Sequence, residues 1–159
     1  SLCDWSSDVA LPIWSIAQCL EHLMITNTAF YPQFDAVARG EKRASLLERL
    51  PGLPRFWGTF LIKALLPAST TRIKAPASIR PTASALDGAI VGRFLGHMKE
   101  LAAKMQSLEH RNPADVILTS PFAPFMTYSA LDACRIGVVH ARRHLGQAER
   151  VMATPGFPA

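Results

Sequence analysis

The sequence predicts an all-α fold in which antiparallel helices form a bundle. Twelve prolines divide the 159 residues into five longer proline-free stretches, and proline interrupts a helix because it lacks an N–H donor and clashes with the preceding turn. Apolar residues within the stretches recur every three or four positions, which is the helical period. We find no strand pattern bounded by hairpin turns and no internal repeat. A bundle is the simplest fold that buries such stripes.

The three shorter stretches, at 13–31, 33–50 and 55–66, each have room for a helix. Within the second, residues 39–42 have the character of a helix end. Leu46, Leu47 and Leu50 then indicate one or two further helical turns.

The two long stretches, 82–112 and 125–154, predict the main helices. Thr82 is a candidate N-cap for the first of them, and Asn112-Pro113 ends it. Each carries an apolar stripe. The stripes are Leu86, Ile90, Phe94, His97, Leu101, Met105 and Leu108 in the first, and Leu131, Cys134, Val138, Ala141, Leu145, Ala148 and Met152 in the second.

The connections at 67–81 and 111–124 are rich in proline and predict loops. The first carries Arg72, Lys74 and Arg80 and no acidic residue. Nucleic acid is nevertheless not an expected partner, because the basic residues are scattered, without interleaved aromatic residues or a known nucleic-acid motif.

Composition predicts one soluble domain over residues 1–159. Apolar residues make up 49% and the net charge is +5, values that exclude an intrinsically disordered chain. No apolar run has the roughly 18 residues of a membrane span, and no signal peptide opens the chain. Three cysteines at wide spacing argue against a disulfide framework and for a reducing compartment. We therefore expect a cytoplasmic protein.

His140 and His144 are the strongest candidates for chemistry. Their i, i+4 spacing places both imidazoles on one face of a helix, one turn apart, where they can bind one divalent ion. We expect this face to point inward, because charged residues occupy the outward positions. The row of residues along this face, called here the histidine seam, also contains small residues. Either a neighbouring helix approaches closely there or a cleft stays open. The outward positions are Asp132, Arg135, Arg142, Arg143, Glu149 and Arg150, and the small residues are Ala130, Ala133 and Gly137.

A third ligand is expected from His22, in the segment WSIAQCLEHL. Three histidines from two helices leave coordination positions open, as in catalytic metal sites. Gln18 and Gln147 are candidates to orient the ligands. A buried hydrogen-bond network without metal stays open as the alternative at this point.

Other side chains near these segments have weaker claims. Cys19 fits a small buried apolar residue better than a ligand, and His97 fits a hydrogen-bonded core histidine better than a fourth ligand. His97, Arg142 and Arg143 are candidates for substrate contact, the arginines for an anionic group. His110 fits an interaction with a helix C-terminus and is assigned no function.

Together these residues resemble the DinB/YfiT-like superfamily of metalloenzymes. Trp14-Ser15 leads to His22, and HARRHLGQ supplies the pattern HxxxHxxQ at His140, His144 and Gln147. The resemblance spans residues 12 to 152.

The resemblance implies an up-down-down-up four-helix bundle, a homodimer, and a divalent zinc, nickel or iron ion on the three histidines. It also implies a metal-dependent transferase that uses a low-molecular-weight thiol, or a hydrolase, acting on a small electrophilic substrate. Only thirteen residues precede Trp14, so the first helix of the bundle is expected to be short or missing. The rival function is a non-catalytic helical bundle that binds a partner or small ligand without metal.

Overall fold

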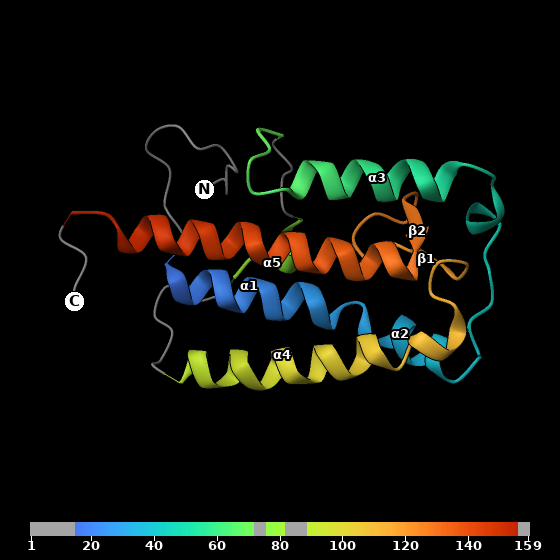
Figure 1. Ribbon diagram of the computed structural model, residues 1–159, viewed down its shortest axis with the longest axis horizontal. Coiled ribbons are helices and arrows are strands. Elements are labelled where there is room, and N and C mark those ends of the chain that lie inside the picture. The colour runs from blue at the N-terminus through green and yellow to red at the C-terminus, as the bar shows by residue number, and fades with distance from the viewer. Residues whose placement is uncertain (1–14, 72–75, 82–88, 156–159) are drawn as a thin grey trace.

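The computed structural model describes residues 15–71, 76–81 and 89–155, and it shows a mainly α-helical chain (Figure 1). This confirms the predicted class, while Thr82 and Leu86 lie outside the described residues. The helices are α1 (Ile16–Thr28), α2 (Tyr31–Ala38), α3 (Leu53–Leu65), α4 (Ile90–Gln106) and α5 (Ala130–Met152). Short 3-10 turns, η1 (Leu47–Arg49), η2 (Ala77–Ile79) and η3 (Glu109–Arg111), and strands β1 (Ile117–Thr119) and β2 (Thr127–Ser129) complete the described elements.

Serine caps begin the two helices that carry the histidine candidates. At α1, Ser15 and Gln18 form a capping box, in which each side chain accepts a hydrogen bond from the backbone N–H of the other. At α5, the Ser129 hydroxyl accepts from the N–H of Asp132, whose carboxylate lies in the positively polarised first turn. These caps fix where each helix begins, and so which residues share its inner face.

Left-handed residues follow the predicted helix ends. Gly40, with φ 74°, comes after α2, at the helix end predicted over 39–42. Asn112, with φ 50°, follows η3 and precedes Pro113. Glycine and asparagine are the residues that adopt this conformation most readily. The α-helix itself ends earlier than predicted, at Gln106, and only the 3-10 turn η3 continues to the predicted stop at Asn112-Pro113.

The expectation of a chain without strands is wrong. β1 lies in the predicted loop 111–124, and β2 occupies the first part of the predicted helix 125–154. The two strands pair antiparallel, with Leu118 opposite Tyr128. Three residues are too few to display the alternating pattern of a strand, and the connection over 120–126 is too long for a tight-turn signal.

The long helices lie side by side in the order α3, α5, α1 and α4 (Figure 1). The colours show that α1 and α4 run in one direction and α3 and α5 in the other. Helix α5 therefore packs against α3 and α1 together, which brings residues from both ends of the sequence to one interface. None of the helices among the described residues has both the length and the apolarity needed to cross a membrane.

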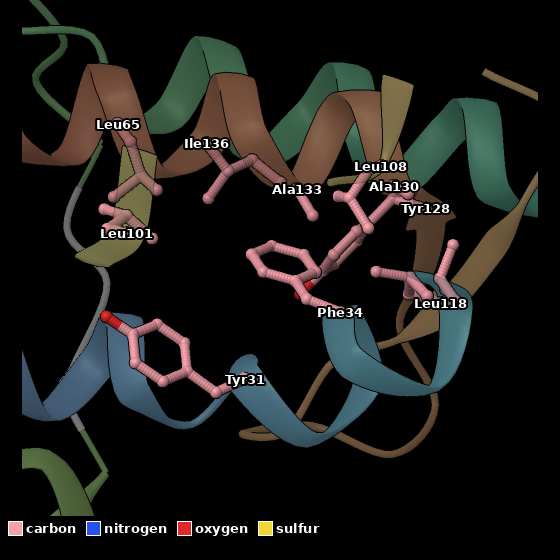
Figure 2. Packing of buried hydrophobic residues seen from close by; sticks show 11 residues of the cluster. Tyr31, Phe34, Leu65, Leu101, Leu108, Leu118, Tyr128, Ala130, Ala133 and Ile136 are labelled. Carbon is pink, nitrogen blue, oxygen red and sulfur yellow. The ribbon is translucent and has the colours of Figure 1, made fainter. Parts of the chain in front are cut away.

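Part of the buried core lies where α2 meets the small sheet (Figure 2). Phe34, Leu118 and Tyr128 are at most 1% exposed, and Phe34 and Tyr128 point toward one another. Leu118 and Tyr128 share one face of the hairpin. The strands thus lie at the end of the helical array where α5 begins.

The apolar stripe predicted for the last helix is mostly not in the core, which corrects the sequence analysis. Val138, Leu145 and Met152 are 45%, 47% and 57% exposed, although Ala148 is buried. Helix α1 packs on the histidine side of α5 and α3 packs on its Arg143 side, whereas the side that carries Val138, Leu145 and Met152 stays exposed. The seam itself is closely packed, because a Cβ on Gly137 would lie 3.4 Å from Met105 Cε.

Candidate metal centre

The structure brings His22, His140 and His144 together between α1 and α5. One ring nitrogen from each lies within 4.8 Å of the others. The three side chains are 0%, 9% and 2% exposed. Residues separated by more than a hundred positions therefore share one buried site.

Hydrogen bonding fixes the orientation of His22. Its Nδ1 lies 2.6 Å from the carbonyl oxygen of Ile79 in η2. A carbonyl can only accept, so Nδ1 carries the proton and Nε2 presents its lone pair. A backbone carbonyl bonded to the second ring nitrogen is the usual support of a metal-binding histidine.

Two of the three separations between the nitrogen atoms match those found around a bound metal ion, and all three atoms lie within 4.8 Å of one another. His140 Nε2 lies 3.3 Å from His22 Nε2 and 3.2 Å from His144 Nε2. Ligands about 2.0–2.1 Å from a tetrahedral zinc ion lie roughly 3.3–3.4 Å apart. The donor set thus fits a small divalent ion, and the same separations also allow hydrogen bonds between the rings.

Burial keeps the three imidazoles neutral. It lowers the pKa of His22, and it lowers the pKa of His144 to about 3, with the neighbouring His22 adding to the effect. Burial, followed by the charges of His144 and His22, holds the pKa of His140 well below its ordinary value. Neutral rings retain the lone pairs that a cation needs.

The two glutamines lie on the same helices as the ligands. The Gln147 side chain hydrogen-bonds His144 and acts to raise its pKa against the effect of burial. The Gln18 side-chain oxygen accepts from the N–H of Ser15, 2.9 Å away, one turn before His22. Gln147 therefore touches the candidate ligand directly, and Gln18 fixes the start of the helix that carries one.

Arg143 does not occupy the outward position that the sequence analysis expected. It is 8% exposed, and its Nη1 donates to the carbonyls of Ala64, Leu66 and Ser69. The inner face of α5 is wider than the histidine seam because α3 packs on its Arg143 side. Arg142, the next residue back along the chain, is exposed.

His97 has the hydrogen-bonded surroundings that were expected for it. Its Nε2 lies 3.3 Å from Asn27 Nδ2, its Nδ1 lies 3.3 Å from the Tyr31 hydroxyl, and its ring stacks on that of Tyr31. Cys19 is 1% exposed, as expected for a small apolar core residue. His110 is exposed in η3.

The Ile79 carbonyl is a contact of the site that the sequence does not predict. It belongs to a loop in the sequence prediction, and a backbone carbonyl has no residue-type signal that could reveal its role. Its position depends on how the chain returns from α3 to α4.

This arrangement can hold one divalent cation through three neutral nitrogens. When bound, such an ion would supply Lewis-acid chemistry. The chain's own contribution is the fixed set of lone pairs, the Ile79 and Gln147 hydrogen bonds, and the exclusion of bulk water from the imidazoles. No protein-family model, curated protein or solved structure matches this chain.

Proposed function

We propose that this protein is a divalent-metal-dependent enzyme of the DinB/YfiT type, with His22, His140 and His144 as metal ligands. The observation that carries the proposal is the convergence of three buried Nε2 atoms, one of them oriented by the Ile79 carbonyl. The order of Trp14-Ser15, His22 and HxxxHxxQ in the sequence supports it.

The proposed reaction is the transfer of a low-molecular-weight thiol to a small electrophilic substrate, or the hydrolysis of such a substrate. Zinc, nickel or iron is the proposed ion, because imidazole nitrogens suit all three metals. Arg142, which is exposed, and His97 remain candidates for substrate contact. The up-down-down-up bundle, its homodimer and a cytoplasmic location likewise stay predictions of the resemblance and the composition.

A non-catalytic bundle that binds a partner or small ligand without metal is the second candidate. The specific observation in its favour is that the His140 nitrogen lies within hydrogen-bond distance of both other rings. In that case the histidines would stabilise the interface of α1 and α5 and bind no ion.

Elemental analysis separates the two candidates. Protein purified without a histidine tag is expected to hold about one equivalent of zinc, nickel or iron per chain. His144→Ala is expected to lose that ion while its circular dichroism spectrum stays helical, because two imidazoles bind far more weakly than three. The exposed His110→Ala is the matched control and should keep the ion.

Two results would contradict the metal site. Wild-type protein without metal after reconstitution would favour the non-catalytic bundle. An unchanged metal content in His144→Ala would show that the ion binds elsewhere. If the metal binds as proposed, a screen of thiol-dependent transfers with and without chelator tests the reaction itself.

A further inference from the structure

A pocket of about 480 Å³ lies beside the first turns of α3 and α5. Its volume is within the range of roughly 300–1,000 Å³ that is typical of small-molecule sites. None of its described lining residues is a histidine of the candidate metal centre. Arg135, which lines it, precedes His140 by roughly 8 Å along the axis of α5. The pocket is therefore a separate feature of the molecule.

Three arginines from three elements line this pocket: Arg49 in η1, Arg55 in α3 and Arg135 in α5. Arg135 donates to Asp132 Oδ1 at 3.1 Å. Within the described part of the chain, Arg49 and Arg55 form no ion pair. Two guanidinium groups of the pocket lining are thus available to an anion.

The acidic residues of the pocket do not cancel this positive charge. Glu48 is 5% exposed, and its carboxylate accepts hydrogen bonds from Lys42 Nζ, the N–H of Ser45 and the Thr119 hydroxyl. The Asp132 carboxylate is paired with Arg135. Each acid is therefore already neutralised by groups of the protein.

The start of α3 adds to the positive character of the pocket. Gly52 and Pro54 line the wall there, no acidic residue lies in the first turn, and no described side chain caps the helix. The first N–H groups of a helix carry partial positive charge. Leu50, Ile117 and Leu131 contribute apolar surface to the same pocket.

We propose that this pocket binds a small organic anion. Its carboxylate or phosphate group lies between Arg49 and Arg55, and its apolar part lies against Leu50 and Leu131. Guanidinium groups form paired, charge-assisted hydrogen bonds with such oxyanions. The proposal is independent of the metal centre, since the two sites share no residue.

Calorimetric titration with phenyl phosphate, benzoate and inorganic phosphate tests this proposal on the whole chain as purified. Phenyl phosphate or benzoate is expected to bind saturably, and more tightly than inorganic phosphate, which lacks the apolar part. Arg55→Gln should weaken binding roughly tenfold, because it removes a charged donor. Arg150→Gln is the matched control: it removes the same charge from an exposed site near the other end of α5 and should change the affinity less than about twofold.

Amide chemical shifts locate the bound anion. Saturating phenyl phosphate should shift the resonances of Gly52, Ala114 and Leu131, which line the pocket, and leave that of Gly146 unchanged. No saturable binding up to about 10 mM would overturn the proposal. Equal weakening by Arg55→Gln and Arg150→Gln would overturn it as well, since binding would then follow the overall charge. Equal affinities for phenyl phosphate and inorganic phosphate would contradict the inference that the ligand has an apolar part that contributes to binding.

Discussion

Arg143 joins the last helix to the end of α3 through one buried guanidinium. Its Nη1 lies 3.1 Å from the carbonyls of Ala64 and Leu66 and 3.3 Å from that of Ser69. The last carbonyls of a helix have no partner within the helix. Arg143 supplies that partner and holds the chain that leaves α3 against α5. Burial lowers the pKa of Arg143, but an arginine remains charged at any pH at which the protein is folded.

Arg143→Met is expected to lower the free energy of unfolding by about 2 kcal/mol, because it leaves the buried carbonyl of Ala64 and the partly buried carbonyls of Leu66 and Ser69 without their charged donor. Arg142→Met provides the control, as Arg142 is exposed, adjacent in sequence and equal in charge. It should change stability by less than about 0.5 kcal/mol. Urea denaturation measures both. Equal effects in the two variants would show that the hydrogen bonds of Arg143 do not stabilise the fold.

At the scale of elements, α3 and α5 approach one another closely where Gly58 faces Asp132. A Cβ on Gly58 would lie 2.6 Å from Asp132 Oδ2 and 3.2 Å from its Cβ. The Asp132 side chain is short, and it is paired with Arg135 at 3.1 Å. The absence of a side chain at Gly58 therefore allows the two helices to pack at this distance.

Gly58→Ala is expected to lower the free energy of unfolding by about 1–3 kcal/mol, since overpacking outweighs the better helix propensity of alanine. Gly96→Ala in α4 makes the same chemical change where nothing lies within 4 Å of the new Cβ. It should raise stability by about 0.5–1 kcal/mol. Thermal and urea denaturation of the two variants test whether their free energies of unfolding change in opposite directions. A Gly58→Ala protein as stable as Gly96→Ala would exclude the close helix contact.

At the scale of the whole molecule, the buried histidines link folding to pH. The folded chain holds His22, His140 and His144 with lowered pKa values, whereas the unfolded chain exposes them with ordinary values near 6.5. Below that pH the unfolded state binds more protons than the folded state. The free energy of unfolding must then decrease as the pH falls.

For metal-free protein, we expect stability to decrease from about pH 6.5 downward, by up to about 1.4 kcal/mol per pH unit for each buried histidine. The contribution of His144 continues to its folded pKa of about 3. Urea denaturation at pH 7, 6 and 5 in the presence of chelator measures the dependence. His144→Gln should reduce the slope of the free energy of unfolding against pH by the equivalent of about one proton. The exposed His110→Gln should leave that slope nearly unchanged. A flat stability profile between pH 7 and 5 would contradict the burial of neutral rings.

Residue patterns within one helical turn were sufficient to predict the features of this protein that depend on local geometry. The three-to-four residue spacing of apolar positions predicted the helical class, and Gly40 lies at the helix end predicted over 39–42. His140 and His144 share a face because i, i+4 positions always do on a helix. No fold needs to be known for that inference.

The remaining features of the fold and of the candidate site depend on contacts between segments that are distant in the sequence. The Ile79 carbonyl lies 57 residues from His22 and reaches it only through the path of the chain between α3 and α4. Arg143 faces inward, and Val138 outward, because of where α3 and α1 pack on α5. Periodicity gives the angle of a residue around its helix, but the neighbouring elements determine which angles are buried. The two strands form only as a pair, and neither is long enough to show its own pattern.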